Sequence, residues 1–146
     1  MPQLGLSSAM KMEGISVIAA TARQMVDDEA RVVAGQRVLV HGAGGRVGSL
    51  AVQLAMARGA TVVGTSPPGA TDYVRSLGVE RVVDGTAEDS TRDIAPVDAV
   101  IDTVGGATQG KLLAALAPGG ILVSSVSQPD PALTAKLGVR GVFILV

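Results

Sequence analysis

The stretch Val38-Leu39-Val40-His41-Gly42-Ala43-Gly44-Gly45-Arg46-Val47-Gly48 decides the fold of this chain, because an apolar run enters a glycine-rich turn and a helical pattern follows at once. This order of strand, turn and helix gives a glycine motif its structural context. Gly42 is suited to a tight turn. Gly45 allows the backbone to come close to a phosphate, and Gly48 allows the helix to pack closely on the strand. The free N–H groups and partial positive charge of the helix N-terminus would then face an anion.

The spacing of these glycines is G-x-x-G-x-x-G, through Gly42, Gly45 and Gly48, rather than the usual G-x-G-x-x-G. Glycine is common in this chain, with 19 among 146 residues, so the pattern by itself carries little weight. The competing interpretation is a glycine-rich turn in an α/β domain that binds no ligand. The strand before the turn and the helix after it favour the phosphate site.

The rest of the chain alternates between apolar runs and helical patterns. Strands are predicted over residues 37–41, 60–65, 81–84, 97–103, 121–125 and 139–146, and helices over residues 15–31, 46–58, 71–77, 108–116 and 132–137. Gly59, Gly78 and the pair Gly119-Gly120 are predicted to end helices. Such alternation indicates βαβ units. We therefore predict one α/β domain over residues 15–146, a Rossmann-type doubly wound parallel sheet of six strands, after a poorly structured lead-in over residues 1–14.

Composition narrows the classes of function. Aromatic residues make up 1% of the chain and the net charge is −1, which argues against binding to nucleic acid or to an anionic membrane. With no cysteine and one histidine, we expect neither disulfides nor a metal site built from this segment. We see no membrane-spanning run and no signal peptide, and expect a cytoplasmic protein.

Several further motifs occur in an order that resembles one family. They are TARQ at 21–24, GQRVLVHGA at 35–43, GRVGSLAVQLA at 45–55, VRSLG at 74–78, DTVGG at 102–106 and LAPGG at 116–120. On these residues the chain from Thr21 to Val146 resembles the zinc-independent quinone oxidoreductase branch of the medium-chain dehydrogenase/reductases, to which the enoyl reductase domains of polyketide synthases are related.

The resemblance implies an NADPH-binding domain and direct hydride transfer to a quinone or an enone without metal. It places the pyrophosphate at Gly45, Arg46 and Val47, and the nicotinamide near residues 102–105 and 124–125. The candidate cofactor-binding residues are Gly42, Gly45, Arg46, Val47, Gly48, Ser66, Tyr73, Thr103, Val104, Ser124 and Thr21. No catalytic residue is assigned from the sequence.

Two departures from the family pattern affect these expectations. The GroES-like catalytic domain, which forms the other wall of the family's active-site cleft, has no counterpart in this sequence. At the expected adenosine end, Pro67 and Gly69 stand where NADP-binding members carry Ser and Arg or Lys. No acidic residue ends the second predicted strand, which disfavours selection of NAD through its ribose diol. We therefore expect NADPH binding that is weak or lost, with Ser66, Tyr73 and Arg75 as partial substitutes.

Individual polar side chains allow two interpretations each. His41 is either a general acid near the phosphates or a strand-end histidine that hydrogen-bonds to backbone and has no catalytic role, and the second is favoured. Asp102 is more readily a hydrogen-bonding or capping residue than a catalytic one. Tyr73 and Arg46 either contact a phosphate or have no ligand role.

The last predicted strand ends in the apolar run from Gly141 to Val146, which as a sheet edge would expose unpaired N–H and C=O groups. In the family this strand pairs with its twin, so we predict a homodimer by that route. The competing interpretation is that another segment covers the edge.

Three functions remain open at this point. The first is the cofactor-binding domain of a quinone oxidoreductase-like enzyme. The second is a truncated relative that performs a cofactor-independent step, such as an isomerisation, dehydration or cyclisation. The third is a non-catalytic dimeric module that binds NADPH. The substrate cannot be inferred from a fold, because the residues that contact it would belong mostly to the missing domain.

Overall fold

The computed structural model describes residues 9–85, 94 and 96–145 of the chain, and side chains from Ser16 onward within that part. The strands run over β1 Arg37–His41, β2 Thr61–Ser66, β3 Arg81–Asp84, β4 Val97–Asp102, β5 Leu116–Ser124 and β6 Arg140–Phe143. The longer helices are α1 Ala9–Arg23, α2 Arg46–Ala57, α3 Thr71–Ser76, α4 Gln109–Ala114 and α5 Pro131–Leu137, and the short helical turns are η1 Gln24–Glu29, η2 Pro68–Ala70 and η3 Gly106–Thr108.

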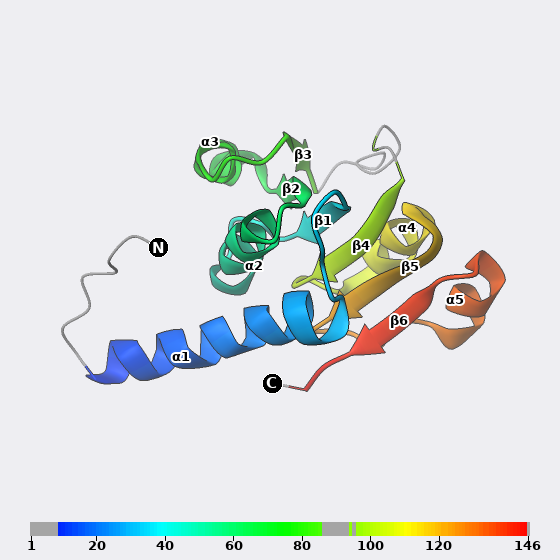
Figure 1. The fold of residues 1–146 in the computed structure, drawn as a ribbon, viewed down its shortest axis with the longest axis horizontal. Helices are drawn as coiled ribbons and strands as arrows, with labels where there is room; N and C mark the ends of the chain where they lie inside the picture. The colour runs from blue at the N-terminus through cyan, green and yellow to red at the C-terminus, as the bar shows by residue number, and fades with distance from the viewer. Residues whose placement is uncertain (1–8, 86–93, 95, 146) are drawn as a thin grey trace.

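The strands form a six-stranded sheet in the order β3-β2-β1-β4-β5-β6, and every neighbouring pair is parallel. This is the strand order of the doubly wound dinucleotide-binding fold, so the predicted fold class is confirmed. The order reverses between β1 and β4, and ligands of such sheets bind outside the carboxyl ends of the strands at that point. The turn after His41 lies there (Figure 1).

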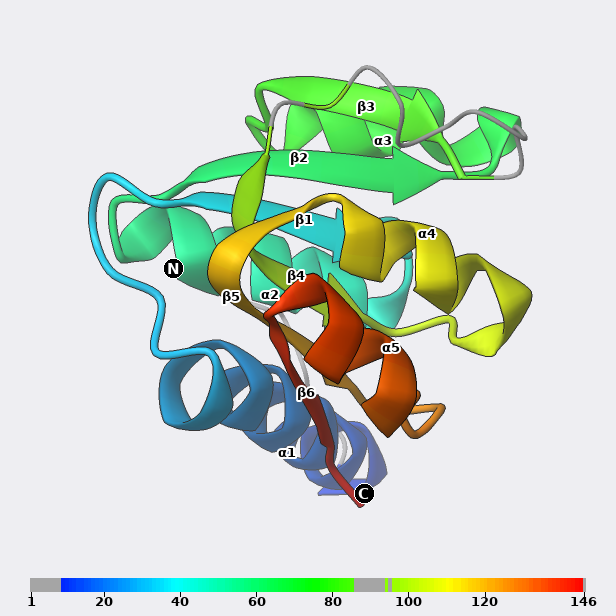
Figure 2. The same cartoon turned by 90° about the vertical axis from the view of Figure 1, so that its right-hand side faces the viewer.

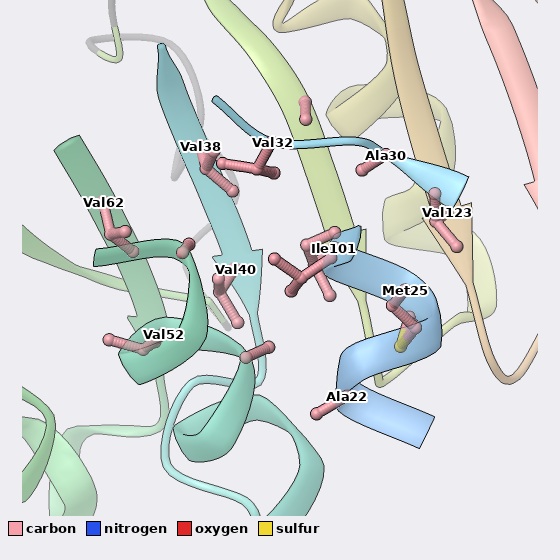
Figure 3. Packing of buried hydrophobic residues seen from close by; sticks show 14 of the residues in the cluster. Ala22, Met25, Ala30, Val32, Val38, Val40, Val52, Val62, Ile101 and Val123 are labelled. Atoms are coloured by element: carbon pink, nitrogen blue, oxygen red, sulfur yellow. The ribbon is translucent and has the colours of Figure 1, made fainter. Parts of the chain in front are cut away.

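Helices cover both faces of the sheet, as Figures 1 and 2 show from two sides. On one face, buried residues of α1, η1, α2 and α3 pack on alternate residues of the strands, including Val38, Val40, Ile101 and Val123. Figure 3 shows Met25 of η1 close to Ile101 and Val123. On the other face, Leu112 and Leu113 of α4 pack with Leu39, Val100 and Leu122. Burial on both faces explains why these strands are continuous aliphatic runs.

The first helix differs from its prediction at both ends. It begins at Ala9, whereas we predicted a start at residue 15 after a poorly structured lead-in; residues 1–8 lie outside the described part. It continues into the π-helical turn η1 and ends at Glu29, before Arg31, which has a φ of 51°. The serines and glycine of the lead-in suggested a loop, but Gly14 is tolerated within the helix.

The fifth strand also begins earlier than predicted. Gly119 and Gly120 lie within β5, so the prediction that they end a helix is wrong; α4 ends at Ala114 instead. Gly119 has a φ of +80°, and a Cβ on Gly120 would lie 2.9 Å from the carbonyl oxygens of both Ala117 and Asp98. The pairing of β4 with β5 shifts register here, between Val97 and Ala99. Glycines are therefore needed at an irregularity in the strand, which local sequence does not distinguish from a helix end.

The sixth strand spans Arg140–Phe143, which is shorter than the predicted 139–146. It lies at one edge of the sheet and pairs with β5. Leu145, just beyond it, is 84% exposed.

Candidate functional site

The turn after β1 contains two glycines that closely approach other parts of the protein. Gly42 has a φ of +86°, and a Cβ there would collide with Thr103 Oγ1 and lie 2.8 Å from Val104 Cγ2. At Gly48, in the first turn of α2, a Cβ would collide with the carbonyl oxygen of Gly42 and lie 2.8 Å from its carbon. Real Cβ atoms do not approach other atoms so closely. The neighbours are side chains at Gly42, whose positive φ also favours glycine, and backbone at Gly48, so both positions require glycine for packing inside the protein.

Gly45 differs from these two glycines. Its φ of −78° and ψ of 176° are open to any residue, and a Cβ would meet only the carbonyl oxygen of Gly42, at 3.5 Å. Gly45 is also exposed and is the N-cap of α2, with no side-chain cap for the first-turn N–H groups. Internal packing therefore does not explain a glycine here. An uncapped helix N-terminus beside bare backbone is suited to bind a phosphate group.

A row of polar side chains crosses the sheet at the carboxyl ends of the strands. Thr65 of β2, His41 of β1, Asp102 of β4 and Ser124 of β5 are aligned partners in neighbouring strands. All of them are buried, with exposures between 0% and 5%. Sequence analysis named His41, Asp102 and Ser124 but missed Thr65; a polar residue at the end of an apolar strand is the signal that could have found it.

Asp102 organises the loops that follow β4 and β5. Its Oδ1 accepts hydrogen bonds from the backbone N–H groups of Val104, at 3.1 Å, and Gly105, at 2.8 Å. Its Oδ2 accepts from Gln109 Nε2 at 3.0 Å and from Ser124 Oγ at 3.1 Å. A buried carboxylate needs such donors, so the hydrogen-bonding interpretation of Asp102 is the one that the structure supports.

Ser124 extends this arrangement to the next loop. Its Oγ accepts hydrogen bonds from the N–H groups of Val126 and Ser127, at 3.2 and 3.1 Å. Val104 and Val126 are 51% and 49% exposed. Two apolar side chains are thus held at the surface beside the point where the strand order reverses.

At the end of β2 the structure places Ser66 inside the protein, 2% exposed. Its Oγ is buried and has no hydrogen-bond partner within the described part of the chain. Tyr73 of α3 is 49% exposed, and Arg75 lies 3.5 Å from Asp72 in an exposed ion pair. A buried hydroxyl without a partner is uncommon in proteins and calls for an explanation, such as a ligand.

The remaining candidates divide between this edge and α1. Arg46 is exposed and Val47 half-buried at the start of α2, and Thr103 adjoins Gly42. Thr21 is buried on α1, and its Oγ1 donates to Val17 O at 2.9 Å, within its own helix. The structure therefore brings the glycine turn, Thr103 and Val104 together, whereas Thr21 makes its hydrogen bond elsewhere.

His41 is a buried side chain at the end of β1. Its Nδ1 lies 2.6 Å from Thr65 Oγ1, and its Nε2 is buried without a partner among the described residues. Burial lowers the pKa of His41 below 6.5, and the nearby charge of Asp102 opposes this in part. The favoured interpretation, a strand-end histidine, agrees with this placement, although a threonine hydroxyl rather than backbone is its partner.

The described residues offer neither a cluster of metal ligands nor a membrane-spanning helix. They contain no group of three or more His, Cys, Asp or Glu side chains that could hold a metal ion. In the same part of the chain, no helix combines the length and apolar character needed to cross a bilayer.

Comparisons with known proteins agree with this geometry. A family described as zinc-binding dehydrogenase matches residues 47–141. The medium chain reductase pydE of Acremonium sp. is 42% identical over 101 residues, which are 64% of this chain and 28% of that protein.

Two solved structures show the same arrangement of the chain. CurK enoyl reductase has a TM-score of 0.86 at 25% identity, over 99% of this chain and 46% of that one. The quinone oxidoreductase from Coxiella burnetii has a TM-score of 0.75 at 29% identity, and the match covers 90% of this chain and 41% of that one.

The chain belongs to the medium-chain dehydrogenase/reductase superfamily and corresponds to its nucleotide-binding domain. The resemblance seen in the sequence is thereby confirmed. The chain spans less than a third of the length of the curated relative pydE, so the activity of a whole enzyme remains a proposal.

The packing of Gly48 predicts a large effect of one methyl group. Gly48→Ala should lower the free energy of unfolding by about 1–3 kcal/mol, because Cβ meets backbone that cannot move aside. Gly110→Ala in α4 is the matched control, because its Cβ would meet only Leu133 Cδ2, at 3.7 Å. Urea denaturation should show this control unchanged or more stable by up to about 1 kcal/mol. Equal stability of the two variants would contradict the packing argument.

The lowered pKa of His41 predicts a dependence of stability on pH. The unfolded chain binds a proton at a higher pH than the folded chain, so stability falls as pH drops below about 6.5 and is independent of this group above it. Urea denaturation of the wild type and of His41→Asn at pH 7.5 and 5.5 measures the effect. The stability of the wild type relative to the variant should decrease at pH 5.5. A constant or growing difference would contradict the direction of the shift.

Proposed function

We propose that this chain is the NADP(H)-binding domain of an oxidoreductase that reduces an enone or a quinone by hydride transfer, without a metal ion. The observation that carries the proposal is the uncapped N-terminus of α2 behind Gly45, the one turn glycine whose missing side chain internal packing does not require. The backbone there is free to approach a pyrophosphate.

The residues around this point fit the other parts of a dinucleotide. The buried Ser66 Oγ, at the end of β2, is a hydrogen-bonding group without a partner among the described residues, where the ribose of the adenosine would lie. Val104 and Val126 offer apolar surface for the nicotinamide ring. Ser66 is neutral and no acidic side chain ends β2, which favours NADPH over NADH to a modest degree.

The bound cofactor would supply the hydride. The chain's own residues would bind and orient it: the N–H groups of the first turn of α2 at the pyrophosphate, and Asp102 and Ser124 through the loops that they order. The valines of these loops would keep water from one side of the nicotinamide. No proton donor for the substrate is assigned to this domain, whose relatives are longer than this chain.

Titration with NADPH and NADH, followed by calorimetry, tests the proposal. We expect a Kd for NADPH in the micromolar range, about −8 kcal/mol. Gly45→Ala should fold normally, because its Cβ has room at 3.5 Å from its nearest neighbour, and should bind at least about tenfold more weakly by keeping the pyrophosphate away.

The control for this titration is Gly110→Ala, which adds the same methyl group on α4 and should bind like the wild type. If the wild type binds neither nucleotide at millimolar concentration, the proposal is wrong. The alternative, an enzyme that turns over its substrate without nicotinamide, should then be tested.

We further propose a homodimer in which the β6 edges of two copies pair. An edge strand presents unpaired backbone groups, and Leu145 next to it is 84% exposed. Sedimentation equilibrium at micromolar concentration should give twice the mass of one chain. Leu145→Asp should shift the mass toward one chain, whereas Val33→Asp, at a residue that is 57% exposed before β1, should not. A wild-type mass of one chain would overturn the dimer.

A further inference from the structure

Thr65 contacts the glycine turn through both its backbone and its side chain. It is 1% exposed and is the aligned partner of His41 in the neighbouring strand. Its carbonyl oxygen accepts a hydrogen bond from Ala43 N at 2.9 Å, which continues the pairing of the strands. Its Oγ1 accepts from Gly42 N at 3.1 Å and lies 2.6 Å from His41 Nδ1. One hydroxyl thus joins the first glycine of the turn to the buried histidine.

The protons on these groups can be assigned by counting. A threonine hydroxyl carries one proton and two acceptor positions. The N–H of Gly42 uses one acceptor position, so the hydroxyl proton is satisfied if Thr65 donates to Nδ1 of a neutral His41. The opposite tautomer would leave the Thr65 proton without a described partner, in addition to the partnerless Nε2. We therefore assign a chain of hydrogen bonds from Gly42 N–H to Thr65 Oγ1 and on to His41 Nδ1.

Gly42 connects Thr65 to the start of α2 through its N–H and its carbonyl oxygen, which belong to successive peptide groups. The carbonyl oxygen of Gly42 accepts from Gly45 N at 3.1 Å, and the carbonyl oxygen of Gly45 accepts from Ser49 N at 2.8 Å. The hydrogen bond at Gly42 N therefore holds Gly42 on its N-terminal side, and the carbonyl oxygen on its C-terminal side positions Gly45. A path of hydrogen bonds connects Thr65 to the N-cap of α2.

The turn is also held from β4. Thr103 Oγ1 donates to the carbonyl oxygen of His41 at 2.8 Å, and Thr103 N donates to the same oxygen at 3.2 Å. Thr103 and Thr65 therefore hold the two ends of one peptide group, its carbonyl oxygen at His41 and its N–H at Gly42. The loss of Thr65 Oγ1 would release the N–H end, while Thr103 would still hold the carbonyl end.

We propose that Thr65, oriented by His41, is a positioning residue for nucleotide binding: its hydroxyl holds the N–H of Gly42 so that Gly45 and the first turn of α2 meet the pyrophosphate. The inference rests on the proposed function and adds a residue that does not itself touch the nucleotide. His41 acts one step further away, because it accepts the Thr65 proton and so keeps the hydroxyl oxygen facing Gly42.

The experiment compares Thr65→Val with Thr65→Ser. Valine has the shape of threonine but no hydroxyl, whereas serine keeps it. We expect the Kd of NADPH, measured by calorimetry well below the melting temperature, to rise at least about tenfold in Thr65→Val, and Thr65→Ser to restore most of that loss. Circular dichroism and urea denaturation report whether each variant is folded under the conditions of the titration.

A second pair of variants keeps the test independent of the folding of Thr65→Val. His41→Leu removes the acceptor of the Thr65 proton and should raise the Kd at least about threefold, whereas His41→Asn offers Oδ1 as a replacement acceptor and should raise it less. Gly110→Ala on α4, whose Cβ would meet only Leu133 Cδ2 at 3.7 Å, is the common reference.

The outcomes separate the two proposals. A wild type that binds no nucleotide overturns the proposed function together with this inference. A wild type that binds NADPH, with Thr65→Val and His41→Leu less stable but equally tight binders, overturns the positioning role alone. Weaker binding in both, with recovery in the serine and asparagine variants, supports it, because a loss of stability alone does not change the Kd of protein that stays folded.

Discussion

The structure depends on one close approach of backbone to backbone, between the first turn of α2 and the carbonyl group of Gly42. It leaves no space for a Cβ at Gly48, and the positive φ of Gly42 brings Thr103 against the turn from β4. The helix axis is thereby fixed relative to β1 and β4, where the strand order reverses. The N-terminus of α2 can face the carboxyl ends of the strands only because these contacts are made.

The buried polar row connects this packing to the candidate site. Thr65, His41, Asp102 and Ser124 lie on one face of the sheet, immediately beyond the apolar residues Leu39, Val63, Val100 and Leu122. Hydrogen bonds from the row also reach the loops after β1, β4 and β5, at the backbone N–H groups of Gly42, Gly105 and Val126. Burial makes these bonds costly to break, so the row keeps the loops in place without the help of a ligand.

Much of the fold could be predicted because strand and helix patterns in this chain are strong and the order of elements admits few topologies. β1, β3 and the start of α2 lie where the sequence predicted them. The wrong predictions concern residues that are compatible with two different local structures. Gly119 and Gly120 suit a helix end or a strand irregularity, and the neighbouring carbonyl of Asp98 decides for the strand. The early start of α1 had no clear signal in the mixed residues before Ile15.

The sequence by itself determined the fold class, the family and the glycine turn, because these follow from local periodicity and from motifs that are contiguous in the chain. Only the tertiary structure decided which turn glycine is free of internal contacts, that Ser66 Oγ is buried without a described partner, and that Thr65 joins Gly42 to His41. The physical reason is that these properties depend on the alignment of parallel strands far apart in sequence. A difference of one residue in that alignment would direct each side chain to the opposite face.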